Sequence, residues 1–212
     1  MPVESIGQIL ITKGIITEAE LHEALKRQER EKDKYLGQIL CEMGISQSRI
    51  VKALYYSQKR KQLGQILVDL KVITEDQLKN ALTEQKKLSE KKKRKPLGTI
   101  LVDTGVIDED HYVKALSVHF SMPVISLKGY VVSELLQKAV GEQYALQQRI
   151  VVLENGSYRI VAAVAEPNLY MMEELERVVG PRKGIMFCIA KASEIELCLN
   201  MKYDPFFGSR YR

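Results

Sequence analysis

The stretch Ser5-Ile6-Gly7-Gln8-Ile9-Leu10 is repeated, with small changes, three more times along the chain. Its glycine returns at positions 37, 64 and 98. Self-similarity at a spacing of this kind is typical of helical units that bury their apolar faces against one another. The three copies are Tyr35-Leu36-Gly37-Gln38-Ile39-Leu40, Gln62-Leu63-Gly64-Gln65-Ile66-Leu67 and Pro96-Leu97-Gly98-Thr99-Ile100-Leu101.

The first repeat shows how one unit is built. The apolar residues of its opening stretch share one helical face, and Gly14 follows where that helix should stop in a left-handed turn. Thr17 then stands at a helix N-cap, with Glu20 three residues later to complete a capping box. The unit is therefore predicted to be helix, tight turn, helix. The apolar stripe of its second helix is Leu21, Ala24 and Leu25.

The other repeats follow this plan with individual changes. Thr74 and Gln77 form the capping pair of the third repeat, where Lys71 replaces the turn glycine. Ser46 can cap in the second repeat, which has lost one residue between its glycine and its Ala-Leu pair. Asp108 is the expected cap of the fourth. Since helices of this length are marginal alone, the four units should pack as a bundle.

The pattern changes after Phe120, where short β-rich and helical runs alternate. Asn155-Gly156 between two β-rich runs predicts a hairpin with a two-residue turn. We therefore expect an α+β fold, with an N-terminal all-helical repeat bundle followed by a small mixed α/β domain. The expected strands are 122–127, 148–154, 158–165 and 184–189, and the expected helices are 132–140, 169–179 and 193–202.

These patterns also suggest domain boundaries. We expect a helical repeat region over residues 1–90, a basic linker over 91–95, the fourth unit with the α/β part over 96–203, and a flexible tail over 204–212.

Composition limits the class of protein. The 212 residues can bury a core, and no apolar run approaches the roughly 18 residues that a membrane span requires. The three cysteines, Cys41, Cys188 and Cys198, lie far apart without metal-ligand spacing, so reduced thiols are expected. We expect a cytoplasmic protein that meets a membrane only through a partner.

Positive charge is concentrated between Lys86 and Lys95, where seven basic residues accompany one acid, Glu90. The simple interpretation is a solvated helix end or linker. The other is attraction to phosphates of a nucleotide, a nucleic acid or an anionic membrane. Because few aromatic residues are interleaved with the lysines, nucleic acid is an unlikely partner.

No catalytic constellation is found in the sequence. A phosphate-binding loop ending in Gly-Lys-Ser or Gly-Lys-Thr is missing, and the nearest string, at 180–184, has the wrong spacing. His22, His111 and His119 have no partner at metal-ligand spacing. We therefore expect no enzyme activity, no metal and no resident cofactor.

The repeated motif, Leu-Gly-x-x-Ile-Leu, a turn, Ile-Thr-Glu and then Leu-x-x-Ala-Leu-x-x-Gln, resembles a known domain. It is similar to the N-terminal domain of type II secretion and type IV pilus assembly ATPases, often called MshEN. The resemblance continues into the second half of the chain. The similar segments there are Met122-Pro123-Val124-Ile125-Ser126-Leu127, Val161-Ala162-Ala163-Val164-Ala165-Glu166-Pro167 and Ser193-Glu194-Ile195.

In some members of this family, two such motifs bind cyclic di-GMP, and the resemblance implies the same ligand here. Glycines would allow close approach, leucines would contact the bases, and the last glutamine would bind a base edge. Where the family has Arg before Leu-Gly, this chain has a lysine one position earlier in three repeats. The implied ligand-binding residues are Ile6, Gly7, Leu21, Leu25, Gln28, Lys61, Leu63, Gly64, Leu78, Leu82 and Gln85.

The resemblance implies a regulatory or adaptor module without a motor domain. Its expected partner is a cyclic dinucleotide or a protein of the secretion or pilus machinery. One alternative is a docking module for an inner-membrane component of that machinery, with no nucleotide ligand. At the level of the repeats, the competing interpretation is that Leu-Gly and Ala-Leu only close the helix pairs.

Overall fold

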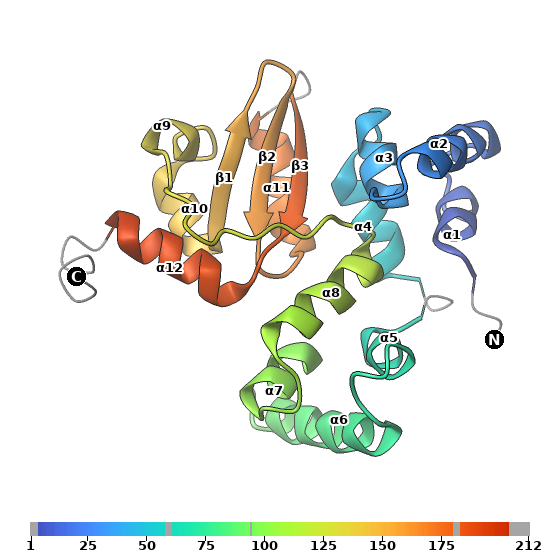
Figure 1. Cartoon of the computed structure of the whole chain (residues 1–212), viewed down its shortest axis with the longest axis vertical. Helices are drawn as coiled ribbons and strands as arrows, with labels where there is room; N and C mark the ends of the chain where they lie inside the picture. Colours follow the sequence, from blue (N-terminus) through green and yellow to red (C-terminus); the bar gives the residue numbers. More distant parts are fainter. Residues whose placement is uncertain (1–3, 58–60, 94, 180–182, 204–212) are drawn as a thin grey trace. The chain divides into compact units, whose positions relative to one another are not determined.

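The computed structural model describes residues 4–57, 61–93, 95–179 and 183–203, and the tail expected over 204–212 lies outside this range. The chain divides into two units (Figure 1). The first unit combines Met1–Arg60 with Phe120–Arg212, and the second is Lys61–His119. The expected α+β class, with helices first and a small sheet later, is confirmed.

Each repeat forms a short helix, a turn and a longer helix. The helices of the first repeat pair are α1 (Ile6–Thr12), α2 (Glu18–Arg30), α3 (Leu36–Glu42) and α4 (Gln47–Tyr55). Those of the second repeat pair are α5 (Leu63–Asp69), α6 (Glu75–Glu90), α7 (Leu97–Asp103) and α8 (Glu109–Phe120).

Local side-chain chemistry sets the helix ends as the sequence predicts. The Thr17 backbone N–H donates to the Glu20 carboxylate at 2.7 Å, and that of Thr74 donates to Gln77 Oε1 at 2.8 Å, so both capping boxes are confirmed. Gly14 has a φ of 64°. Lys71, which replaces the turn glycine in the third repeat, adopts a φ of 57°, a conformation that L residues rarely take.

The repeated glycine allows a close helix crossing. A Cβ atom on Gly7 would lie 2.7 Å from Leu21 Cδ1, and one on Gly64 would lie 2.5 Å from Leu78 Cδ1. Gly37 differs, because its missing Cβ faces the backbone oxygen of Ser121. The shortened second repeat thus uses a residue from the start of the α/β segment as its contact.

The first two repeats share one apolar core. Residues from all four helices and from the first turn take part, so neither repeat is closed alone. The buried members are Ile9, Leu10, Ile16, Ala24, Ile39, Leu40, Ile50, Ala53 and Leu54.

The α/β part is a three-stranded sheet in the order β1-β2-β3, with β1 and β2 antiparallel and β2 and β3 parallel. Helix α12 packs on one face through a shared apolar cluster, and α11 lies behind the sheet in Figure 1. The elements are α9 (Glu134–Gln137), α10 (Glu142–Gln148), β1 (Ile150–Asn155), β2 (Arg159–Val164), α11 (Leu169–Val179), β3 (Gly184–Ile189) and α12 (Ala192–Tyr203).

Two buried glutamines close the edges of this sheet. Gln47 in α4 donates to Phe187 O at 3.0 Å and accepts from Phe187 N at 2.5 Å. Gln137 donates to Ile150 O at 3.1 Å and accepts from Val152 N at 2.6 Å. A side-chain amide thus replaces the peptide group of an added strand at both edges, which protects the sheet from further pairing.

Several predicted elements need correction. Residues 122–127 do not form a strand but a single bridge between Val124 and Ile189, because Gln47 already occupies the next position along β3. The helix predicted over 132–140 is only α9, whose last residue turns its side chain to β1. Helix α10 was not predicted, and Gly141, with a φ of 85°, separates it from α9.

The predicted two-residue turn at Asn155-Gly156 is also wrong. Asn155 pairs with Ile160 as part of the strand, and the loop runs through residues 156–158. The Gly156 N–H donates to Arg159 O at 2.9 Å across this longer loop.

Besides Gln47, one carboxylate helps to hold helix α4 against the α/β part. Glu176 in α11 accepts from Ser46 Oγ at 2.9 Å, from Ser48 N at 3.2 Å and from Ser48 Oγ at 2.5 Å. A carboxylate at a helix N-terminus satisfies otherwise unpaired N–H groups. The second repeat and the α/β part therefore belong to a single unit.

No helix among the described residues has both the length and the apolar character needed to cross a membrane. The cysteines Cys41, Cys188 and Cys198 are free thiols, and burial raises the pKa of Cys41 and of Cys188 to about 12.

The glycine contacts predict unequal effects of alanine. Gly37→Ala should lower the free energy of unfolding by about 2 kcal/mol, because a Cβ there meets backbone, which cannot move freely. Gly7→Ala is the matched control and should cost less, because the methyl ends of Leu21 can shift. Urea unfolding followed by circular dichroism measures both, and equal costs would contradict the assignment.

Candidate ligand-binding site

The last glutamine of a repeat ties that repeat to the next one. Gln28 Nε2 donates to Lys34 O at 2.9 Å, and Gln85 Nε2 donates to Lys95 O at 3.0 Å. In keeping with this, α2 packs on α3 and α6 packs on α7. The repeats therefore work in neighbouring pairs, the first with the second in one unit and the third with the fourth in the other.

The two glutamines stand beside exposed leucines. Leu25 is 44% exposed and Leu82 is 47% exposed, although both come from apolar stripes. The equivalent residues of the second and fourth repeats, Leu54 and Leu116, are only 1% and 3% exposed. Within the part of the chain that the structure describes, the two uncovered leucines belong to the repeats whose glutamine hydrogen-bonds the next repeat. We call the faces carrying Leu25 with Gln28 and Leu82 with Gln85 the first and second platforms.

The other predicted site residues lie beneath these faces. Gly7 and Gly64 are buried under Leu21 and Leu78, as the helix crossings require. Ile6 and Leu63, one residue before each glycine, are partly buried. Within the described residues, the Oε1 atoms of Gln28 and Gln85 accept no hydrogen bond, so each platform offers a leucine surface with one open acceptor.

Three repeats carry a lysine just before the short helix, and each lysine pairs with the acid that is the last residue of that helix. Lys34 contacts Glu42 at 3.0 Å, Lys95 contacts Asp103 at 2.8 Å, and Lys61 pairs with Asp69. The lysine and the acid are eight residues apart in all three repeats, and this spacing is the sequence signal of the pair. Lys61, a predicted site residue, thus has Asp69 as an internal partner. The hydrogen bond from Lys61 lowers the pKa of Asp69.

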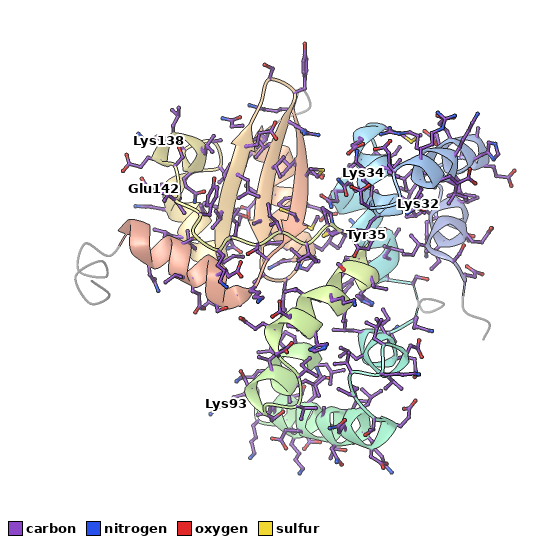
Figure 2. All side chains as sticks on the ribbon, in the orientation of Figure 1. Lys32, Lys34, Tyr35, Lys93, Lys138 and Glu142 are labelled. Carbon is purple, nitrogen blue, oxygen red and sulfur yellow. The ribbon has the colours of Figure 1, made fainter. Side chains whose placement is uncertain are left out.

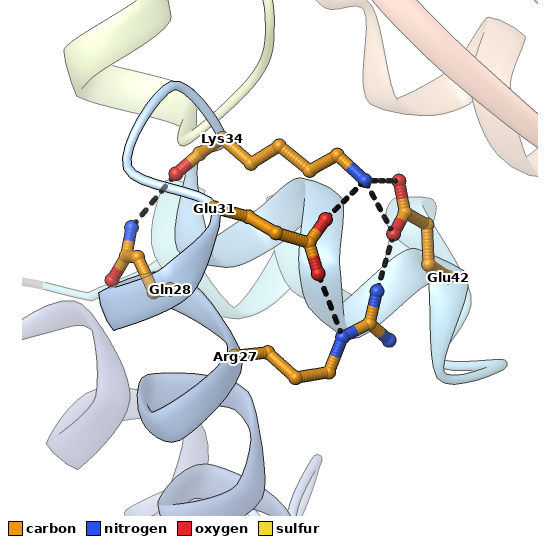
Figure 3. A network of polar contacts seen from close by, with 5 residues as sticks. All are labelled: Arg27, Gln28, Glu31, Lys34 and Glu42. Carbon is orange, nitrogen blue, oxygen red and sulfur yellow. Dashed lines mark hydrogen bonds and ion pairs between the residues drawn. The ribbon is translucent and has the colours of Figure 1, made fainter.

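Around the first platform these charges form a closed network (Figure 3). Glu42 accepts from Arg27 at 2.7 Å and from Lys34 at 3.0 Å, while Glu31 contacts Arg27 at 3.3 Å and Lys34 at 2.5 Å. The Lys34 hydrogen bond is the main cause of the lowered pKa of Glu31, and the same bond raises the pKa of Lys34. Two cations and two carboxylates neutralise one another.

The second platform does not have this network. When Gly64 is aligned with Gly7, Glu84 and Leu88 stand where the first pair has Arg27 and Glu31. The remaining Lys95–Asp103 pair has side chains that are 50% and 49% exposed, against 27% and 17% for Lys34 and Glu42. The second platform is therefore more open to solvent.

Both platforms are helix faces. The structure also has two pockets among the described residues, and neither is lined by the leucine or the glutamine of a platform. One, of about 290 Å³, lies between the turn at Ile45 and the start of β3. The other, of about 660 Å³, lies between the turns at Lys71 and Val106. A ligand of the platforms would therefore spread over a surface instead of filling a cavity.

Comparison with known proteins identifies the family of the α/β part. Residues 120–206 match the MshEN domain. A solved structure, described as MshE with cdg (cyclic di-GMP), is 28% identical to this chain and superposes on it with a TM-score of 0.59. The alignment covers 68% of this chain and 100% of the MshE chain. A comparison with curated proteins gives no match. The match to the MshEN domain thus lies in the α/β part of the chain, and it supports the resemblance to an MshEN-type N-terminal domain.

The charge network makes a prediction about acid stability. Because Glu31 has a lowered folded pKa, its contribution to stability is present above the pKa of the unfolded chain and is lost as pH falls through the folded value. Lys34→Met should move the pKa of Glu31 upward, since it removes the main hydrogen bond. Carboxyl ¹³C NMR titration measures this, and an unchanged Glu31 pKa would contradict the network.

Proposed function

We propose that this chain is a non-catalytic regulatory module whose platforms bind cyclic di-GMP. The supporting observation is that Leu25 and Leu82 are uncovered beside Gln28 and Gln85, whereas Leu54 and Leu116 are buried. Leaving a large apolar side chain in water has a cost that a bound aromatic base would remove. The structural match to MshE with cdg supports the same ligand.

The chemistry of guanine suits these faces. A guanine ring has an apolar surface that can lie on a leucine, and its edge carries N–H donors. The free Oε1 of Gln28 or Gln85 is a carbonyl acceptor beside that leucine. Because Nε2 is fixed to a backbone carbonyl, the amide orientation is set before the ligand arrives, which lowers the entropic cost of binding.

The first platform also lies where a ligand could affect the α/β part. The first repeat pair is joined to the sheet through Gln47 and Glu176, so a shift of α2 against α3 would reach β3 through α4. A protein of the secretion or pilus machinery is the proposed reader of that change, through the MshEN-type domain.

A second candidate function is protein docking without a nucleotide. Val131 and Leu135, which lie at the start of the α/β part, are 80% and 78% exposed. Two large apolar side chains so near each other in the chain suit a partner surface. This favours the docking module for an inner-membrane component of the same machinery.

Isothermal titration calorimetry with cyclic di-GMP tests the ligand proposal. We expect binding in the micromolar range or tighter, and a loss of about tenfold or more for Gln28→Ala combined with Gln85→Ala, because a paired acceptor is removed at each platform. Gln8→Ala, an exposed glutamine in α1, is the matched control and should bind as the unaltered chain does. No heat with the unaltered chain would overturn the proposal in favour of docking.

A further inference from the structure

The face of the second platform carries two lysines. Lys79 and Lys86 lie about one helical turn before and after Leu82 on α6, so all three share one side of the helix. Both lysines are exposed, and neither forms an ion pair among the described residues. The uncovered leucine is thus flanked on each side by a lysine that is in no ion pair of the described residues.

The first platform has the same geometry but different charges. His22 and Glu29 flank Leu25 at the equivalent positions of α2. His22 and Glu29 are both exposed. This face therefore carries an acidic residue beside its leucine, where the second platform carries two lysines.

The segments that follow the two glutamines also differ in charge, and again the one beside the second platform is the more basic. Residues 86–93 contain five lysines and one acid, whereas residues 29–33 contain two basic and three acidic residues. Lys93 projects away from the fold, and Lys32 marks the shorter connection of the first pair (Figure 2). The step from Gly64 to Gly98 is longer than that from Gly7 to Gly37, and the extra length lies in this lysine-rich segment.

We infer that the second platform, in Lys61–His119, is the higher-affinity site of this chain and that Lys79 and Lys86 bind the two phosphates of the cyclic dinucleotide. This inference rests on the proposed function and adds the phosphate-binding residues to it. The lysines before the short helices do not serve this role, because Lys34, Lys61 and Lys95 are paired with acids.

The charge count of the ligand supports the assignment. A cyclic dinucleotide carries two phosphodiester groups with one negative charge each, and exposed lysines attract such groups strongly at low salt. A glutamate in place of Lys86, as at Glu29, repels the same groups. The first platform therefore keeps the base-binding elements but opposes the phosphates.

Calorimetry with cyclic di-GMP at about 50 and 300 mM salt tests this on the full chain. The double variant Lys79→Gln with Lys86→Gln should bind about tenfold more weakly at low salt and should lose most of the salt dependence. Lys87→Gln with Lys91→Gln removes the same charge at a helix position off the Leu82 face and at the C-cap, and should keep most of the affinity. Thermal unfolding verifies that all variants are folded.

Single glutamine variants locate the site independently. Gln85→Ala should weaken binding far more than Gln28→Ala, and Glu29→Lys should strengthen the first platform in a Gln85→Ala background. Binding by the unaltered chain that is insensitive to Lys79 and Lys86 would overturn this inference and leave the proposed function standing. No binding by the unaltered chain would overturn both.

Discussion

The helical part of this protein depends on a contact that only glycine allows. In the first, third and fourth repeats, the short helix crosses its partner so closely that the first residue of the apolar stripe fills the place of the glycine Cβ. In the second repeat, Ser121 fills that place, and its Oγ accepts the Gly37 N–H at 2.8 Å. The close contact at the glycine therefore packs the two helices of a repeat together in the first, third and fourth repeats. In the second repeat it joins the short helix to the α/β part.

This arrangement separates the residues that support the fold from those that face solvent. In the first and third repeats, the glycine and the first leucine of the stripe meet at the crossing, which leaves the second leucine and the glutamine to define the surface. Pairing then decides which leucines remain uncovered, since Leu54 and Leu116 are buried and Leu25 and Leu82 are not. Two related surfaces result, one within a charge-neutral setting and one among lysines.

The sequence predicted those structural features that depend only on residues close together in the chain. The capping boxes at Thr17 and Thr74 and the strand at 184–189 follow from local patterns and are confirmed. The strand at 122–127 and the turn at Asn155 were wrong, and the first depends on Gln47, a side chain far along the chain from its partner Phe187. For the platforms, the motif supplied the residues, but their exposure depends on which repeats pair, and no local pattern contains that information.

Solution NMR of the full chain tests the pairing of the repeats most directly. The side-chain amide protons of Gln28 should show nuclear Overhauser contacts to Lys34 and Tyr35, and those of Gln85 should show contacts to Lys95 and Pro96. Contacts from Gln28 to the start of the third or fourth repeat, or an absence of contacts from both amides, would contradict the account.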